Sequence, residues 1–347
     1  MTATSPFAQH TRKPASTTMR AVIQTVYGTA PTNVLQLAET TRPTIGDDQV
    51  LVRVVASSVD QGTWHVMAGR PFAMRAAGFG IRTPKALNPG RNLAGTIEAV
   101  GANVTDLHPG DEVFGTGEAT FAEYARAKPA TLAPKPANLS FEEAAAVPVS
   151  ALAALQAVRR AGVGAGTSVL IIGASGGVGT FAVQIARAFG ATVTGVATTA
   201  KVELVRSLGA DQVIDYARSD FVDGTRYDAV LDIGGNNRVS RLRRAIAPRG
   251  RLVIVGGEAD ARWLGMGRQL RAHLLSLFVR QTLGTFISSE NATDLNELRE
   301  LIEADKLMPA IERSYPLGET AAAIEHLRAG RARGKLAITI AGANHER

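Results

Sequence analysis

Cysteine is absent from this chain of 347 residues. Its absence excludes disulfides, thiol nucleophiles and every zinc site that needs a cysteine ligand. It also fits a reducing compartment, so we expect a cytoplasmic protein. Aromatic residues are scarce at 5%, whereas 45% hydrophobic and 20% charged residues are typical of a soluble globular protein. A chain of this length is long enough for two domains with separate cores.

Long basic blocks and apolar membrane segments are absent too. The formal net charge is +7, but the densest basic cluster is only four arginines between Arg238 and Arg244. Such a cluster is typical of a solvated helix face, so we expect no nucleic-acid partner. The uncharged run between Arg160 and Arg187 contains seven glycines and changes periodicity midway, so we expect no membrane span.

The most informative stretch runs from Thr167 to Gly190. Residues 168–172 form an apolar run rich in β-branched side chains, which predicts a strand buried on both faces. Apolar residues then recur at three- and four-residue steps, which predicts an amphipathic helix that ends at Gly190. The intervening glycines allow backbone N–H groups and the helix N-terminus to bind a dinucleotide pyrophosphate. The residues expected to contact it are Ser175, Gly176, Gly177 and Val178.

The sequence beyond this turn predicts the rest of a doubly wound sheet. A second strand at 192–197, a helix at about 200–208 and a third strand at 213–215 complete a βαβαβ unit. Further strands at 228–233 and 251–255 each end in glycine. Such glycines are ordinary strand stops, and they are also what a ligand lying over the sheet edge needs. The residues expected at that edge are Ile233, Gly234, Val255 and Gly256.

Two alternatives to a dinucleotide-dependent enzyme remain open. The turn at 173–177 also satisfies G-x-S-x-G, the nucleophile elbow of α/β-hydrolases, with Ser175 as the nucleophile. Asp232 and either His273 or His326 would complete a triad in the right chain order. Against this hydrolase, no H-G-G-G-type loop precedes the turn, and Gly179 has no role in an elbow. The second alternative is a non-catalytic NADPH-binding protein.

The end of the second strand bears on the choice of cofactor. A site that prefers NAD usually has an acidic residue there, which accepts from the ribose 2′-hydroxyl. This chain instead has Thr198 and Thr199, which can donate hydrogen bonds, followed by Lys201, which can neutralise a phosphate. The sequence therefore predicts NADPH rather than NADH as the cofactor.

The first third of the chain has a different pattern. From Met19 to Pro136, short strand signals alternate with turns, one of the expected strands being 119–125, and this predicts a partly open β-barrel. We expect a catalytic domain at 19–137 and 308–347 and a dinucleotide-binding domain at 138–307. Residues 1–18 are expected to be a disordered tail, with a transit peptide as the open alternative.

This order of domains and motifs resembles the medium-chain dehydrogenase/reductase superfamily, specifically its zinc-free quinone oxidoreductase (zeta-crystallin-like) branch. The matching segments are Ala56–Asp60 with Trp64, Pro89–Gly90 with Ala94–Gly95, Gly110–Gly115, Phe121–Tyr124, A-S-G-G-V-G at 174–179, Ser207–Asp211 and Gly334–Lys335. The resemblance implies a GroES-like catalytic domain beside an α/β Rossmann domain. It also implies hydride transfer from NADPH to a quinone or an α,β-unsaturated carbonyl.

The resemblance also assigns individual residues. Asp60 and Trp64 would lie near a small electrophilic substrate, Tyr216 near the 2′-phosphate and Lys335 near the cofactor. Arg91 stands where the zinc-dependent branch has a histidine ligand, so no metal site is expected. Family members are often homodimers, and no general acid can be named from the sequence.

Overall fold

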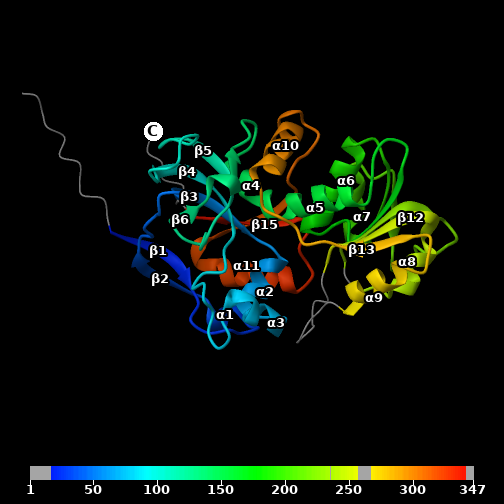
Figure 1. The fold of residues 1–347 in the computed structure, drawn as a ribbon, viewed down its shortest axis with the longest axis horizontal. Helices are drawn as coiled ribbons and strands as arrows, with labels where there is room; N and C mark the ends of the chain where they lie inside the picture. The colour runs from blue at the N-terminus through cyan, green and yellow to red at the C-terminus, as the bar shows by residue number, and fades with distance from the viewer. Residues whose placement is uncertain (1–16, 235, 257–266, 341–347) are drawn as a thin grey trace, which may run out of the picture.

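The computed structural model describes residues 17–234, 236–256 and 267–340. Two large sheets lie at opposite ends of an elongated molecule, and helix α5 (Pro148–Arg160) lies between them (Figure 1). Strand β15 (Lys335–Thr339) belongs to the seven-stranded sheet. The predicted two-domain α/β fold, a GroES-like domain with a Rossmann domain, is confirmed. Nearly all of the tail predicted at 1–18, and the C-terminal residues 341–347, lie outside the described residues.

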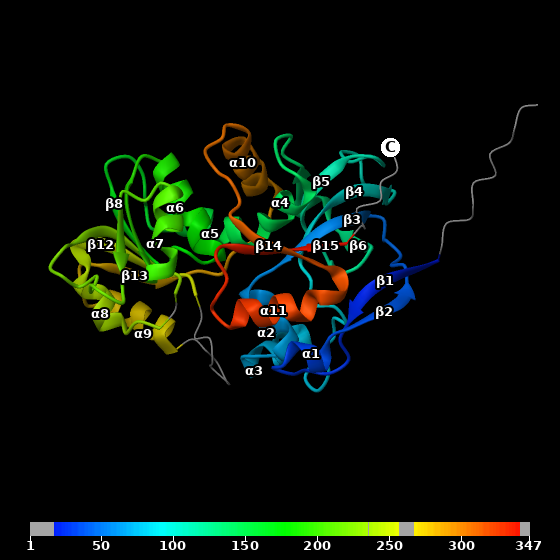
Figure 2. The same cartoon turned by 180° about the vertical axis from the view of Figure 1, so that it is seen from behind.

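The Rossmann domain contains a six-stranded parallel sheet in the order β10-β9-β8-β11-β12-β13. The central strand β8 is the apolar run that the sequence singled out, and Val169, Leu170 and Ile171 are fully buried in it. Helices α6 and α7 cover one face of this sheet, and α8 and α9 cover the other (Figures 1 and 2). The strands are β8 (Ser168–Ile172), β9 (Thr192–Ala197), β10 (Gln212–Asp215), β11 (Tyr227–Asp232), β12 (Ile246–Ile254) and β13 (Thr282–Thr285).

The GroES-like domain contains a seven-stranded sheet in the order β14-β15-β3-β4-β5-β7, with β6 paired to β3. Its strands are β3 (Val50–Val59), β4 (Asn92–Val100), β5 (Glu112–Thr116), β6 (Tyr124–Ala127), β7 (Leu132–Pro134), β14 (Ile311–Pro316) and β15. A separate antiparallel pair is β1 (Thr18–Ile23) with β2 (Gln36–Thr41). Strand β15 lies between β14 and β3, so the end of the chain returns to the first domain as the sequence predicted.

The described helices divide between the two domains. The α-helices besides α5 are α1 (Pro31–Val34), α2 (Gln61–Ala68), α3 (Phe72–Met74), α4 (Phe141–Ala146), α6 (Gly177–Ala188), α7 (Val202–Ser207), α8 (Val239–Arg244), α9 (Gly267–Ser276), α10 (Ala292–Glu303) and α11 (Thr320–Arg328). Short π- or 3₁₀-turns lie at η1 (Arg75–Phe79), η2 (Pro129–Thr131), η3 (Thr199–Lys201) and η4 (Leu317–Glu319). No described helix is both long and apolar enough to cross a bilayer.

The structure corrects the predicted strand at 119–125. The strand β6 begins at Tyr124, and before it only Ala122 pairs, in an isolated bridge with Ala21 among the described residues. Ala119, at the start of the segment, has a left-handed φ of 59°, which turns the chain. The side chain of Asn88 then binds the backbone of Phe121, donating to its carbonyl and accepting from its N–H. The sequence pattern also missed β2 and the helices α2 and α9.

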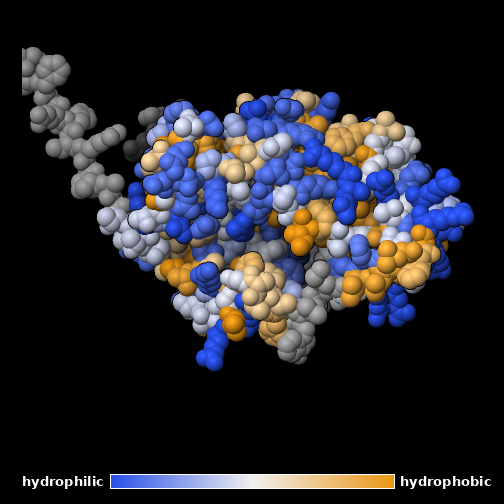
Figure 3. Space-filling view, viewed as in Figure 1, coloured by the Kyte–Doolittle hydropathy of each residue, from blue (hydrophilic) through white to orange (hydrophobic). Residues whose placement is uncertain are grey.

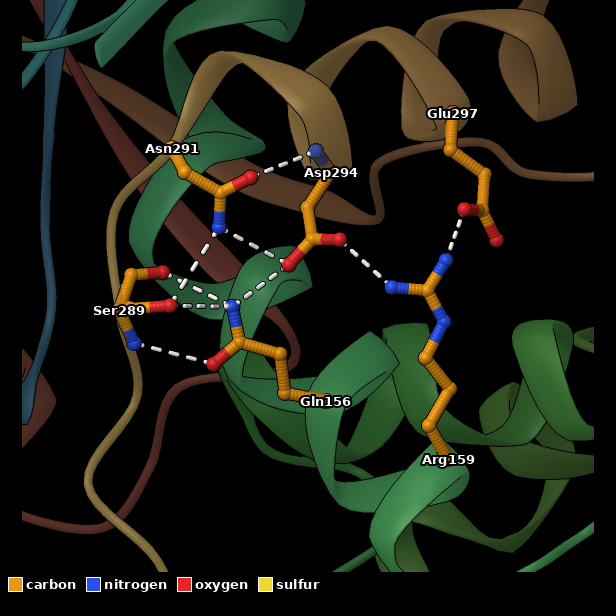
Figure 4. A network of polar contacts seen from close by, with 6 residues as sticks. All are labelled: Gln156, Arg159, Ser289, Asn291, Asp294 and Glu297. Carbon is orange, nitrogen blue, oxygen red and sulfur yellow. Dashed lines mark hydrogen bonds and ion pairs between the residues drawn. The ribbon is translucent and has the colours of Figure 1, made fainter. Parts of the chain in front are cut away.

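Helix α5 joins the cores of the two domains. A single apolar cluster contains residues of the GroES-like sheet, of α5 and of the Rossmann sheet, including Phe114, Leu155 and Ile171. Polar contacts from Gln156 and Arg159 on the same helix reach Asp294 of α10 and the carbonyl of Ser289 (Figure 4). The two domains are therefore packed against each other through α5. A ligand that binds between them would contact both. The domain boundaries at 137/138 and 307/308 stay a prediction.

Candidate active-site cleft

A cleft of about 760 Å³ lies between the two domains. Its walls come from the start of α2, the first turn of α5, the glycine-rich turn before α6, the carboxyl ends of β9 and β11, and the segment that precedes β15. The site residues predicted from sequence that line this cleft are Asp60, Ser175, Gly176, Gly177, Val178, Thr198, Lys201, Tyr216, Ile233, Gly234 and Lys335. Trp64, Thr199, Val255 and Gly256 are not part of this lining.

The glycine-rich turn is shaped by close backbone approach. Gly173 has a φ of +86°, and a Cβ at Gly179 would lie 2.1 Å from the carbonyl oxygen of Gly173. At Gly176, by contrast, the nearest atom to such a Cβ is 3.5 Å away. Gly173 and Gly179 therefore make the turn possible, whereas Gly176 leaves space at the N-terminus of α6. That space lies beside the first turn of α6, whose N–H groups have no acceptor within the helix, and it is suited to a pyrophosphate.

The residues that follow β9 directly are Thr198 and Thr199, so no acidic residue stands at the position that binds a ribose 2′-hydroxyl in NAD-dependent proteins. Thr198 lines the cleft, while the hydroxyl of Thr199 donates to Oδ2 of Asp215 over 2.6 Å. This hydrogen bond is the main reason why the pKa of Asp215 lies below its ordinary value. Tyr216 follows directly and is exposed. The predicted contacts of Thr199 and Tyr216 with a 2′-phosphate stay predictions.

Lys201 connects the two domains across this end of the cleft. Its Nζ donates to the carbonyl oxygens of Gly330 over 3.0 Å and Ala332 over 2.7 Å. Burial lowers the pKa of this lysine, Glu312 opposes that shift and Arg333 adds to it. The ammonium group is thus fixed beside the cleft by two backbone acceptors rather than by a carboxylate.

Arg241 on α8 is a lining residue that sequence reasoning missed. Its guanidinium binds Asp220 over 2.8 Å and lies 4.8 Å from the ring centre of Phe221. The arginine cluster at 238–244 could have drawn attention to this residue, but the sequence pattern assigned the cluster to a solvated helix face. The structure brings a member of this cluster to the cleft, where it adds a positive charge to those of Lys201 and Lys335.

Asp60 lies at the N-terminus of α2 and is held on two sides. Its Oδ1 accepts from the backbone N–H of Thr63 over 3.0 Å, which forms a capping box, and its Oδ2 accepts from Nδ2 of Asn92 over 2.9 Å. Asn92 is fully buried, and its Oδ1 accepts from the N–H of Val149 in α5. This asparagine, also missed from sequence, therefore joins Asp60 to the first turn of α5.

Lys335 lies at the start of β15, directly after a contact between the domains. Gly334 forms an isolated parallel bridge with Gly176, and its N–H donates to the carbonyl of Ser175 over 3.0 Å. The Nζ of Lys335 donates to the carbonyl of Val59 and to Oγ of Ser150. The end of the GroES-like domain is thereby joined to the glycine-rich turn of the Rossmann domain.

Trp64 lies in the core beside the cleft rather than in its wall. Its side chain is buried, the guanidinium carbon of Arg328 lies 3.9 Å from its ring centre, and His65 packs edge-on against it. The predicted contact of Trp64 with substrate stays a prediction.

The hydrolase alternative is not favoured by the geometry. A nucleophile elbow holds its serine on a sharp, strained turn, but Ser175 is not among the described non-glycine residues with positive φ. Asp232 is fully buried in an ion pair with Arg268 over 2.6 Å. His326 bonds the hydroxyl of Tyr315, and His273 is exposed on α9. The proposed triad is therefore not assembled.

Arg91 forms an ion pair with Glu290, which also accepts from the hydroxyl of Thr116 over 2.8 Å. The position that holds a histidine in the zinc-dependent branch is thus occupied by a cation bound to a carboxylate. The described residues contain no group of three or more histidine, cysteine, aspartate or glutamate side chains arranged to hold a metal ion.

Comparison with known proteins identifies the family. Residues 46–137 match the family described as alcohol dehydrogenase GroES-like domain, and residues 208–338 match the one described as zinc-binding dehydrogenase. The chain is 31% identical to 2-methylene-furan-3-one reductase of Solanum lycopersicum, over 92% of this chain and 79% of that protein. It is 30% identical to the chloroplastic NADPH-dependent alkenal/one oxidoreductase of Arabidopsis thaliana, with the same coverage of both chains.

A solved structure agrees with this assignment. The quinone oxidoreductase from Coxiella burnetii superimposes with a TM-score of 0.83 at 29% identity, covering 93% of this chain and 100% of that one. The chain belongs to the medium-chain dehydrogenase/reductase superfamily, in its zinc-free quinone oxidoreductase branch.

Proposed function

We propose that this protein is an NADPH-dependent oxidoreductase that reduces quinones or α,β-unsaturated carbonyl compounds. The observation that carries the proposal is the cleft between the domains. A glycine-rich turn lies there at the N-terminus of α6. The residues after β9 are threonines followed by Lys201, where an NAD-dependent protein would have an acidic residue. Relatives named as alkenal/one and quinone oxidoreductases support the same reaction class. When bound, NADPH supplies a hydride to the electrophilic substrate.

The cofactor-binding residues follow from their places in the cleft. We assign the pyrophosphate to the N–H groups at 175–178, where the Gly176 position leaves open space. Thr198, Lys201 and Tyr216 would hold the 2′-phosphate, with Arg241 as an additional cation. Ile233 and Gly234 would border the dinucleotide at the end of β11. The contacts of Thr199, Val255 and Gly256 with the cofactor belong to the same proposal, although these residues are not part of the lining.

The substrate would bind between Asp60 and the first turn of α5, where Ala153 also lines the cleft. Because Asn92 and Thr63 hold both oxygens of the Asp60 carboxylate, this group is suited to orienting a polar substrate atom. Lys335 lines the same end of the cleft, and NADPH binding by the Lys335→Met variant would test its predicted contact with the cofactor.

Several finer properties belong to the same proposal. Zinc independence is supported by the absence of cysteine and by the Arg91–Glu290 pair. A homodimer is supported by the edge position of β13 in the described sheet and by the exposed apolar side chains of Leu270 and Leu274 on the neighbouring α9. Figure 3 shows apolar surface at the end of the molecule where α9 lies. A cytoplasmic location is supported by the absence of cysteine alone.

The direct test follows NADPH oxidation by the purified full chain with a panel of quinones, enones and enals. We expect turnover with at least one of these classes of electrophile. The activity should survive treatment with a zinc chelator, and it should be weaker with NADH than with NADPH. If NADPH binds but no electrophile in the panel is reduced, the non-catalytic alternative replaces the reductase.

A further inference from the structure

The substrate end of the cleft contains a buried cation without an ion-pair partner. Lys335 is 2% exposed, and its Nζ donates to the carbonyl of Val59 over 3.1 Å and to Oγ of Ser150 over 3.0 Å. Among the described residues, no carboxylate oxygen lies within 4.0 Å of this Nζ. Burying an ammonium group on two neutral acceptors is costly, and such groups are typical of functional sites.

Ser150 has a proton available for donation. Its Oγ accepts from Lys335, and this is the single hydrogen bond of that oxygen within the described part of the chain. Because a hydroxyl that accepts one hydrogen bond still has its own proton, the O–H remains free to donate. Ser150 lies in the first turn of α5 and lines the cleft together with Asp60 and Ala153.

Gly177 lies against this pair, whose two residues line the cleft while being only 1% and 2% exposed. A Cβ at that position would lie 3.1 Å from Cδ of Lys335 and 3.5 Å from Oγ of Ser150. A larger residue would therefore press against both side chains on the cleft side. The glycine-rich turn thus does more than leave room for a pyrophosphate, because it also leaves the Ser150–Lys335 pair next to the ligand space.

Other proton-bearing groups of the cleft are less well placed. Both oxygens of Asp60 already accept hydrogen bonds, from Thr63 and Asn92. Lys201 donates to two backbone carbonyls of the 330–332 segment. Tyr216 is 61% exposed and follows β10, remote in the sheet order from the substrate end.

We propose that Ser150 donates the proton that completes reduction of an α,β-unsaturated carbonyl, and that Lys335 resupplies it; this inference rests on the proposed function. Hydride addition at the β-carbon leaves an enolate. The Ser150 O–H bond breaks as a C–H bond forms at the α-carbon, and a proton passes from Nζ of Lys335 to Oγ of Ser150. The neutral amine regains a proton from solvent after the product leaves.

The electrostatics of Lys335 suit this role. Burial lowers the pKa of its ammonium group, and the carboxylate of Asp60 partly opposes that shift. Asp60 is the charged group among the described residues that acts on Lys335. An ammonium group with a pKa nearer to neutrality is a better proton donor than an exposed lysine.

The test uses an enone with a methyl group on its α-carbon, reduced in D₂O by the full-length protein. The wild type should place deuterium on one face of the α-carbon. Ser150→Ala should lower kcat about 10²-fold, the scale of general acid catalysis, and place deuterium on both faces, with the dissociation constant of NADPH unchanged. Ser150→Thr, which keeps the hydroxyl, should restore the facial selectivity. Ser207→Ala on the exposed end of α7 is the matched control and should behave as wild type.

A second measurement needs no cofactor. The ¹³Cε signal of Lys335 in the free protein should titrate below the ordinary lysine pKa value of 10.5, and Ser150→Ala should shift the midpoint of that titration. Lys335→Met should lower kcat and flatten the alkaline limb of its pH profile while NADPH binding is unchanged. If Lys335→Met instead weakens NADPH binding and Ser150→Ala keeps its rate and facial selectivity, the inference is wrong and the charge serves the cofactor.

The failure of this inference differs from failure of the proposed function. If the wild type reduces quinones but no enone, or if Ser150→Ala matches the wild type on enones, the proton donor is overturned and the reductase stands. If the wild type oxidises NADPH with neither class, the proposed function itself fails.

Discussion

Asn92 donates a hydrogen bond from Nδ2 to Oδ2 of Asp60 over 2.9 Å, and both residues lie where the GroES-like sheet meets α5. The other end of the same amide accepts from the N–H of Val149 over 2.9 Å. One buried side chain therefore sets the distance between the Asp60 carboxylate and the first turn of α5, which together form the substrate end of the cleft.

Replacing Asn92 with Ala should damage both stability and catalysis. It would leave the N–H of Val149 without its acceptor, and a buried group that loses its partner costs about 1–3 kcal/mol. We expect the free energy of unfolding in urea to fall by that amount and kcat to fall more than KM rises. Asn103→Ala is the control, because Asn103 makes a hydrogen bond of similar length to Asp48 on the exposed surface. Equal effects of the two substitutions would contradict this role for Asn92.

Two glycines of the same turn should respond differently to alanine. Gly179→Ala places a Cβ 2.1 Å from the carbonyl oxygen of Gly173, so the turn must deform and the folded protein should be strongly destabilised. Gly176→Ala meets its nearest atom at 3.5 Å and should fold normally, yet it narrows the space assigned to the pyrophosphate. Thermal unfolding and NADPH titration of both variants separate these effects. A stable Gly179→Ala protein would refute the close approach described above.

Asp228 should contribute to acid unfolding. Its Oδ2 accepts from the N–H of Ser168 over 2.9 Å and from its hydroxyl over 2.8 Å, which together lower the pKa of the carboxyl. Because the folded-state pKa lies below the ordinary value of 3.8, the stabilisation is present above that pH and is lost as the pH falls through the folded-state pKa. Urea unfolding at about pH 6 and about pH 3 should therefore show a smaller loss of stability for Asp228→Asn than for wild type. Asp106→Asn is the control, because Asp106 lies on an exposed bend. This variant should lose as much unfolding free energy between the two pH values as the wild type does.

Lys201 should discriminate between the two nicotinamide cofactors. Its ammonium group is fixed by Gly330 and Ala332, so it can meet a 2′-phosphate with little loss of side-chain entropy. We expect Lys201→Ala to raise the dissociation constant of NADPH about tenfold or more, corresponding to about 1.4 kcal/mol, and to change that of NADH little. Lys306→Ala, which alters an exposed lysine after α10, is the control. If both constants rise equally, Lys201 serves the fold rather than the phosphate.

Local sequence patterns were sufficient for most of the fold. The strand at 168–172, the glycine-rich turn and the helix that follows are encoded within one stretch, so periodicity and glycine placement predicted them. The left-handed conformation of Ala119 was not predictable in this way, because alanine carries no local preference for it. The helix α2 was hidden because its cap and its polar residues resemble a turn.

The site was less predictable than the fold, since its contacts join segments far apart in the chain. Asp60 and Asn92 are 32 positions apart, and Ser150 and Lys335 are 185 positions apart. No periodicity links such pairs, and a lone serine or asparagine carries no spacing signal of its own. Arg241 was visible as part of a basic cluster, but only the sheet order brings it to the cleft.

Calorimetric titration of the purified full-length protein with NADPH and, separately, with NADH tests the assignment of the cleft most directly. We expect NADPH to bind at least about tenfold more tightly than NADH, which is a difference of about 1.4 kcal/mol. Failure of both nucleotides to bind, or tighter binding of NADH, would contradict the NADPH site between the two domains.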